Sequence, residues 1–240
     1  MKITTIIPTK NEEANIGPLL DSLLAYSPDE VIVVDGGSDD ETREIVRAKS
    51  EQAGGVRLEV IRGGVIRQLN EAAKLASGDV LFFLHADSRL LCDPFVPIAR
   101  EMASEHVAGG GFRLSYGDAK ARYRFITRTA NWRAGAMGLP MGDQGIFIRA
   151  DVFGLLQGFR EGPLLPDLDL MVRARHHGRI ALVNEPLYTS PRRYEENGFL
   201  RNVLANQLLF YTHVLLSENS PEWAKKMLEK LRARERVVRS

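Results

Sequence analysis

The sequence predicts an α/β fold in which a mainly parallel central sheet is flanked by helices. In the first part of the chain, four strand-like apolar stretches alternate with helix-like stretches, an order typical of strand–helix units. The stretch 30–35 is a short β-branched run, as expected of a strand buried on both faces. No linker rich in Pro, Gly or Ser divides the 240 residues, and no stretch repeats.

The elements of the first half are predicted from the spacing of their apolar residues. The stretch 12–26 places its leucines and Ile16 at helical spacing, which predicts a helix. Ser38 or Asp39 is the expected N-cap of the second helix, and Gly78 is expected to end the third. In chain order, the expected strands are 3–8, 30–35, 56–61 and 79–87, and the expected helices are 12–26, 39–52 and 66–77.

The second half of the chain is less regular. Its expected helices are 93–105, 121–137 with a basic face, and 167–178 ending at Gly178; its expected strands are 108–116 and 179–185. The stretch 142–153 reads as a turn, a strand and the start of a helix, and from Gly198 the chain reads as helical. We therefore expect a domain over 1–195 and a C-terminal helical extension over 196–240, packed on or beside it.

Composition excludes several classes of protein. The formal net charge is +1, so the overall field does not favour nucleic acid as a partner. A single cysteine, Cys92, excludes an internal disulfide and a cysteine-built metal site. The first residues lack the features of a signal peptide, and polar residues interrupt the longest apolar stretch, 199–216. We therefore expect a cytoplasmic protein.

Polar groups follow three of the predicted strands, at the point where each strand ends. PTKNEE follows the first strand, DGGSDDE overlaps the end of the second, and HADS closes the fourth. Because ligands bind beyond the carboxyl ends of the strands in an open parallel sheet, these segments are expected to meet at one edge.

DGGSDDE combines a carboxylate, Asp35, with two glycines that let a ligand approach the backbone, and then a helix N-terminus. The same segment also reads as a tight turn followed by an N-cap. It is not a dinucleotide fingerprint, because GxGxxG is absent, and the phosphate loop GxxxxGK[ST] is absent too.

HADS places His85 and Asp87 two residues apart, a spacing that turns both side chains to one side in extended backbone. Asp is a ligand suited to Mg²⁺ or Mn²⁺, and His suits Mn²⁺ better than Mg²⁺. The pair is therefore a candidate cation site. In the alternative reading, Asp87 only caps the turn that follows the strand.

Together these motifs resemble those of the family 2 glycosyltransferases, which have the GT-A fold. IIPTKNEEANI, VIVVDGGSDDET and LFFLHADS carry the resemblance in the first half. In the second half, GDQGIFIRADVF, DLDLMVRARHHGRIAL and SPRRYEENG resemble a small bacterial subgroup named radical-SAM/selenodomain-associated transferase 2. The similarity extends over residues 2–193, and it is far more specific for the family than for any substrate.

The resemblance implies which residues bind the nucleotide. Pro8 and Glu12 match positions that border the base and ribose, and Asp35, followed by Gly36, matches the acidic residue that contacts the base. The diphosphate would lie near three basic residues: Arg67, Arg192 and Arg193.

The resemblance also implies a metal ligand and a catalytic base, with two departures from the family pattern. The DxD motif reads His85-Ala86-Asp87, so Asp87 would bind the metal without the first carboxylate. The ED pair reads Pro166-Asp167, so the base would be Asp167 without its Glu neighbour. Asp169 is the alternative base. We prefer Asp167 because it follows a loop and opens a helix.

Glycosyl transfer requires that a diphosphate leaving group be stabilised and that an acceptor hydroxyl lose a proton. A divalent cation, Mn²⁺ or Mg²⁺, would stabilise the diphosphate together with Arg67 and Arg192 or Arg193. Asp167 would accept the proton of the acceptor hydroxyl. A single carboxylate opposite the leaving group predicts inversion at the anomeric carbon.

Three further residues are candidates for contact with the sugar. Asp143 and Gln144 of GDQG are expected to hydrogen-bond sugar hydroxyls, with a structured turn as the alternative. His85 could touch the metal, the sugar or the backbone, and the sequence leaves these open. Trp132 is expected to be a core residue rather than a stacking platform.

The C-terminal extension is basic, with seven Lys or Arg and three Glu over 222–239. We expect two helices that close the cleft or pair two subunits as a homodimer. The alternative is peripheral contact with the inner face of an anionic membrane, near a lipid-linked acceptor.

Two rival functions remain. A nucleotidyltransferase is disfavoured because PTKNEEANI has no glycine in place of a Gly-rich loop. A sugar-nucleotide-binding protein without transferase activity stays open because of the altered ED pair. The sequence identifies neither the sugar, nor the base, nor the acceptor.

Overall fold

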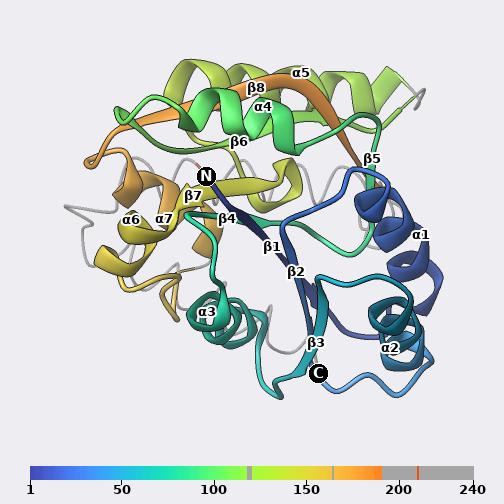
Figure 1. The fold of residues 1–240 in the computed structure, drawn as a ribbon. Helices are drawn as coiled ribbons and strands as arrows, with labels where there is room; N and C mark the ends of the chain where they lie inside the picture. The colour runs from blue at the N-terminus through green and yellow to red at the C-terminus, as the bar shows by residue number, and fades with distance from the viewer. Residues whose placement is uncertain (118–120, 164, 191–209, 211–240) are drawn as a thin grey trace.

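One sheet of eight strands is built from the described part of the chain, in the order β3-β2-β1-β4-β7-β6-β8-β5 (Figure 1). The computed structural model describes residues 1–117, 121–163, 165–190 and 210. The strands are β1 (Ile3–Thr9), β2 (Glu30–Asp35), β3 (Val56–Val60), β4 (Val80–Phe83), β5 (Ser88–Leu90), β6 (Val107–Ser115), β7 (Ile146–Arg149) and β8 (Arg179–Thr189).

Helices cover both faces of the sheet. They are α1 (Glu13–Leu24), α2 (Thr42–Gln52), α3 (Val65–Leu75), α4 (Phe95–Met102), α5 (Ala121–Met137), α6 (Ala150–Leu155) and α7 (Pro166–Ala174), with a 3₁₀ turn η1 (Gly142–Gln144). Alternate residues of β1 and β2 face opposite sides, as a strand requires. Ile7 and Val33 pack with α1, α2 and α4, whereas Ile6 and Ile32 pack with α3, α6 and α7.

The first four predicted strands pair in parallel, as the sequence predicts, with β1 between β2 and β4. The chain therefore reverses its direction of winding between β1 and β4. In open α/β sheets the crevice at such a reversal is where ligands bind. The carboxyl ends of β1 and β4 adjoin, since the backbone N–H of Leu84 donates to the carbonyl of Ile6 at 3.0 Å.

The second half makes the sheet mixed. β7 runs antiparallel to both β4 and β6, and the short strand β5, which the sequence does not predict, runs antiparallel to β8. Glycines let β6 fit between its neighbours: a Cβ at Gly109 would lie 2.5 Å from the carbonyl oxygen of Phe147, and one at Gly110 would lie 2.4 Å from that of Ala181.

Several helix ends differ from the predicted ones. α2 begins at Thr42, so neither Ser38 nor Asp39 is its N-cap; the Ser38 hydroxyl donates instead to the Asp35 carboxylate. α3 ends at Leu75, three residues before Gly78, and α7 ends at Ala174, four residues before Gly178.

The predicted C-terminal extension, with Arg192 and Arg193, lies outside the described residues except for Phe210. That side chain is 1% exposed, belongs to the cluster beneath α3, α6 and α7, and lies 4.8 Å from the Arg133 guanidinium. The division at residue 195 stays a prediction. None of the helices in the described ranges combines the length and apolar composition needed to cross a bilayer.

Candidate functional site

Two loops at the carboxyl ends of β1 and β2 are held together by hydrogen bonds. The backbone N–H of Asn11 donates to Ser38 Oγ, and that of Asp39 donates to Asn11 Oδ1, both at 2.9 Å. The backbone N–H of Gly36 donates to the carbonyl of Thr9 at 2.8 Å. The prediction that PTKNEE and DGGSDDE meet at one edge of the sheet is therefore confirmed.

Asp35 organises the second of these loops. Its carboxylate is fully buried and accepts hydrogen bonds from the backbone N–H of Gly37 (2.9 Å), the backbone N–H of Ser38 (3.0 Å) and the Ser38 hydroxyl. Arg43 Nε lies 3.9 Å away. Both oxygens are therefore engaged in holding the loop, and the contact between Asp35 and a nucleotide base stays a prediction.

Pro8 and Glu12 lie at the same edge of the sheet, near the end of β1 and at the start of α1. Pro8 is half-buried near the end of β1, paired with Val34 of β2. Glu12 is half-buried at the start of α1, where its Oε2 accepts a hydrogen bond from Asn15 Nδ2 at 2.6 Å. Their contact with a nucleotide stays a prediction.

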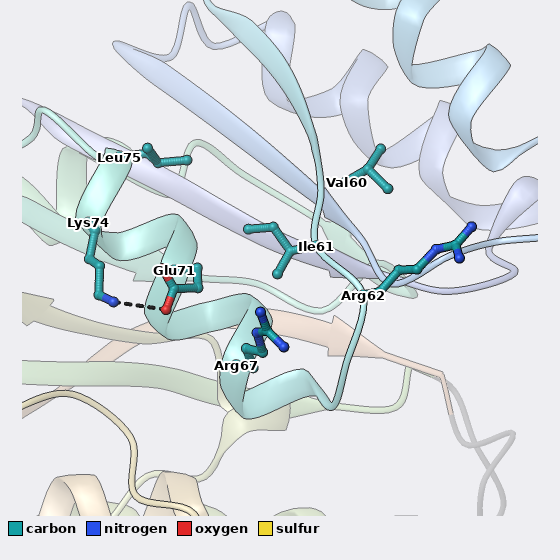
Figure 2. Close-up of a pocket in the computed structure, with 7 residues that line it drawn as sticks. All are labelled: Val60, Ile61, Arg62, Arg67, Glu71, Lys74 and Leu75. Carbon is teal, nitrogen blue, oxygen red and sulfur yellow. Dashed lines mark hydrogen bonds and ion pairs between the residues drawn. The ribbon is translucent and has the colours of Figure 1, made fainter.

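Basic side chains gather beside the DGGS loop. Arg67, in the first turn of α3, lies with Arg62 at the rim of a hollow of about 660 Å³ between the end of β3 and α3 (Figure 2). A Cβ at Gly37 would lie 3.7 Å from Arg62 Cγ, which places this arginine against the loop. His85, Asp87 and Asp167 do not line the hollow, and the contact of Arg67 with a diphosphate stays a prediction.

Gln68 is a further residue at this corner that the sequence does not single out. It is 5% exposed, and its Nε2 donates to the carbonyl of Gly63 at 3.2 Å. A Cβ at Gly36 would lie only 2.3 Å from that Nε2. A side chain at Gly36 would therefore displace the Gln68 amide from its present position. Gly36, the first glycine of DGGS, was the available signal in the sequence.

A second group of residues converges at Gly142, where three segments meet. A Cβ at Gly142 would lie 2.9 Å from His85 Nε2 and 3.2 Å from Asp167 Oδ2. The backbone N–H of Gly142 donates to Asp167 Oδ2 at 2.5 Å. The end of β4, the η1 turn and the N-terminus of α7 thus bring an imidazole, a backbone donor and a carboxylate to one point.

The two acidic residues of α7 have different surroundings. Asp169 accepts a hydrogen bond from Arg173 Nε at 2.8 Å, and Arg173 also donates to the carbonyls of Leu156 and Gly158. This ion pair with Arg173 therefore helps to hold α7 against the loop after α6. Asp167 is half-buried in the first turn of α7, and no described residue other than Gly142 donates to its carboxylate. The geometry favours Asp167 over Asp169 as a group available for chemistry.

HADS is a turn rather than the extended segment that the sequence predicts. β4 ends at Phe83, and the backbone N–H of Ser88 donates to the carbonyl of His85 at 3.1 Å. His85 and Asp87 therefore do not lie on an extended strand, and their two-residue spacing does not by itself turn them to one side. Asp87 is half-buried, and its carboxylate accepts no hydrogen bond from the described residues.

The GDQG turn has a structural role that the sequence reading underestimates. Gln144 is fully buried; its Nε2 donates to the carbonyl of Phe112 at 3.0 Å, and its Oε1 accepts from the backbone N–H of Met141 at 3.2 Å. These hydrogen bonds give Gln144 a structural role in the turn, and its contact with a sugar stays a prediction. Asp143 is half-buried, and its contact with a sugar stays a prediction.

The described residues contain no group of three or more His, Cys, Asp and Glu side chains that could enclose a metal ion. Mg²⁺ and Mn²⁺ bound with nucleotides need fewer, because one or two carboxylates suffice when phosphate oxygens and water complete the shell. Asp87, half-buried at the ligand edge and without a partner among the described residues, fits that requirement.

Comparison with known proteins identifies similar chains. The family described as "Glycosyl transferase family 2" matches residues 4–157. The "PGL/p-HBAD biosynthesis glycosyltransferase" of Mycobacterium tuberculosis is 31% identical over 216 residues, covering 84% of this chain and 80% of its own. The "Undecaprenyl-phosphate 4-deoxy-4-formamido-L-arabinose transferase" of Serratia proteamaculans is 27% identical over 158 residues, covering 62% of this chain and 48% of its own.

Solved structures share the fold. A mannosyltransferase from Pyrobaculum calidifontis, in complex with GDP-Man and Mn²⁺, superposes with a TM-score of 0.64 at 21% identity. This similarity covers 79% of this chain, which spans 56% of the mannosyltransferase chain. Glucosyl-3-phosphoglycerate synthase from M. tuberculosis, with Mn²⁺, UDP and glucosyl-3-phosphoglycerate, superposes with a TM-score of 0.60 at 22% identity, covering 86% of this chain and 78% of its own.

Proposed function

This chain belongs to glycosyl transferase family 2, and on that basis we propose that it transfers a sugar from a nucleotide diphosphate sugar to an acceptor hydroxyl with inversion. It is a glycosyltransferase with the GT-A fold. The observation that carries the finer proposal is the hydrogen bond from the Gly142 backbone to Asp167 Oδ2, beside His85.

Asp167 is the catalytic base of the proposed reaction. The acceptor oxygen attacks the anomeric carbon of the sugar, the bond from that carbon to the diphosphate oxygen breaks, and the hydroxyl proton passes to Asp167. The Gly142 N–H holds one carboxylate oxygen, so the other is oriented for the proton. His85 Nε2 borders the same space and is placed to contact the sugar or the leaving group.

The leaving nucleoside diphosphate develops negative charge that the site must stabilise. Arg67, together with Arg62, supplies guanidinium donors beside the DGGS loop, and such donors bind phosphate oxygens well. A divalent cation held by Asp87 would neutralise further charge on the diphosphate when bound. Mn²⁺ is the proposed ion, and the two solved structures described above contain it.

The donor and acceptor are proposed by class only. GDP-Man and UDP occur in the solved relatives, so UDP-glucose and GDP-mannose are suitable first probes of this chain. One relative is named for transfer involving undecaprenyl phosphate, so a lipid that carries a free hydroxyl is a suitable first acceptor probe. In this proposal, Pro8 and Glu12 contribute to specificity for the nucleotide base. Asp35 contributes through the loop that it holds in place.

The stereochemical outcome tests this proposal. Donor turnover in the presence of Mn²⁺, followed by ¹H NMR of the sugar released to water or acceptor, should give a first product whose anomeric configuration is opposite to that of the donor. A single carboxylate on the face opposite the leaving group can deliver only that outcome in one displacement. A first product that retains the donor configuration would exclude Asp167 as the base of a direct displacement.

A further inference from the structure

The outer face of α5 is unusual for a helix that packs on a sheet. Its inner face is formed by Tyr123, Ile126 and Ala130, which pack against the end of β6. On the opposite side, Phe125 is 66% exposed and Trp132 is 68% exposed, although the sequence predicts Trp132 in the core. Large aromatic side chains that stay exposed on one helix face mark an interaction surface rather than a packing surface.

The charge of this helix is entirely positive. The 17 residues of α5 include four arginines and no acidic residue. Arg124 and Arg128 are exposed, and Arg128 lies between Phe125 and Trp132 along the same face, because residues three and four apart on a helix are neighbours. Aromatic and basic side chains therefore alternate on the outer face.

The basic surface continues beyond the end of α5. Gly135, one turn after Trp132, lines a hollow of about 640 Å³ together with three exposed arginines, Arg113, Arg175 and Arg179. Arg179 also pairs with Glu101 at 2.9 Å. α5 lies at the outside of the molecule, over β6 and β8 (Figure 1). The outer face of α5 and this hollow thus form one surface, here termed the α5 surface.

We propose that the α5 surface docks the enzyme on an anionic lipid bilayer, with α5 lying flat in the headgroup region. Aromatic rings suit the boundary between headgroups and acyl chains, and arginines suit the phosphates above it. A helix of this length would lie along roughly 25 Å of the surface. This surface differs from the basic segment 222–239, and the proposal is independent of the transfer chemistry.

Vesicle co-sedimentation of the full chain tests the proposal. The wild type should bind vesicles of phosphatidylcholine with 30% phosphatidylglycerol, should bind phosphatidylcholine alone at least tenfold more weakly, and should be released by salt. Arg124→Gln with Arg128→Gln should lower the partition coefficient about 30-fold, since each cation contributes about 1 kcal/mol at an anionic surface. Phe125→Gln with Trp132→Gln should lower it by at least tenfold.

Matched controls carry the same chemical changes elsewhere. Leu155→Gln removes an equally exposed apolar side chain from α6, and Arg47→Gln with Arg57→Gln removes two exposed cations from α2 and β3. Both variants should bind like the wild type, and circular dichroism should show all variants folded. In a Trp223→Phe background, Trp132 fluorescence should shift to shorter wavelength when anionic vesicles are added.

Three results would overturn the proposal. The first is unchanged vesicle binding by both α5 variants, with binding lost only when the seven Lys and Arg residues of 222–239 are replaced by Gln. The second is a wild-type dimer that the Phe125/Trp132 variant converts to a monomer without any vesicle binding in the wild type. The third is a Trp132 emission spectrum that anionic vesicles leave unchanged.

Discussion

Gly142 is the position on which the proposed base depends. Its backbone N–H donates to Asp167, and the absence of a side chain leaves room for both His85 and Asp167. A Cβ there would lie 2.9 Å from His85 Nε2, closer than such contacts allow, so that one of the two groups would have to move.

Gly142→Ala should therefore lower kcat by about 10- to 100-fold, because misplacing a reacting group by about 1 Å costs catalysis on that scale. Donor affinity should change little, since the proposed nucleotide-binding residues belong to the loops after β1 and β2 and not to the η1 turn. Steady-state kinetics with a cognate donor and Mn²⁺ measure both quantities.

Gly154→Ala is the matched control for this prediction. Gly154 lies in α6, and a Cβ there would meet no atom within 4 Å. This variant should keep its kcat and gain up to about 1 kcal/mol of stability from its helix propensity. Equal kinetics for the two alanine variants would show that Gly142 does not hold the base.

At the scale of single residues, the sequence indicates which residue types could carry the chemistry, but it does not indicate which contacts each residue makes. Asp87 follows the end of β4 and Asp167 lies in the first turn of α7, positions that follow directly from the order of the predicted elements, while their roles stay predictions. Asp35 and Gln144 are buried and saturated by backbone groups, and Gln68 fills the space at Gly36. Such contacts join segments distant in sequence, and a residue's type does not reveal them.

At the scale of the elements, a polar network fixes β1 and β2 at the edge opposite the site. Glu30 Oε2 accepts hydrogen bonds from Thr4 Oγ1 (2.5 Å), from the backbone N–H of Ser77 (2.9 Å) and from the Ser77 hydroxyl (2.8 Å). Burial raises the pKa of Glu30, but these hydrogen bonds outweigh it and hold the pKa below its ordinary value of 4.5.

Glu30→Gln should therefore lower the free energy of unfolding at pH 7 by about 1 kcal/mol, since the charged acceptor is lost. A carboxyl whose folded pKa is depressed stabilises above its unfolded pKa, and that stabilisation is lost as pH falls through the folded pKa. The difference between wild type and variant should thus shrink below pH 4.5. Urea denaturation across that range measures it. A difference that grows on acidification would contradict the assignment, and kcat should be unchanged in either case.

The elements themselves were predictable where the pattern was long and periodic. The first four strands and three helices follow directly from runs of apolar residues at strand or helix spacing. β5 has only three residues, too few for a pattern, and the antiparallel direction of β7 is set by its neighbours rather than by its own residues. The helical spacing of apolar residues predicted α5, but it did not indicate that the side chains of Phe125 and Trp132 would be exposed.

At the scale of the whole molecule, the site is assembled at the sheet edge from at least five segments: the loops after β1, β2 and β4, the η1 turn and the start of α7. A ligand that bridges these segments stabilises the folded state by mass action. At 100 times its dissociation constant a cognate donor contributes about 2.7 kcal/mol, which raises Tm by roughly 5–10 °C for a domain of this size.

The metal contribution to that shift should depend on Asp87. With the cognate donor present, adding Mn²⁺ should raise Tm further in the wild type, and EDTA should reverse the rise. Asp87→Asn should lose the Mn²⁺-dependent part while keeping the shift due to the nucleotide alone. A full Mn²⁺ response in that variant would place the metal elsewhere.

The central claim is that Asp167, and not Asp169, is the base of this glycosyltransferase. The direct measurement is donor turnover by Asp167→Asn and Asp169→Asn, with donor affinity and thermal stability recorded for both. Asp167→Asn should lose about 10²- to 10⁴-fold in kcat with donor affinity unchanged. Asp169→Asn should keep kcat within a few fold but lose about 1–3 kcal/mol of stability, because its pairing with Arg173 is broken. An Asp167→Asn variant that turns over donor at the wild-type rate would contradict the account.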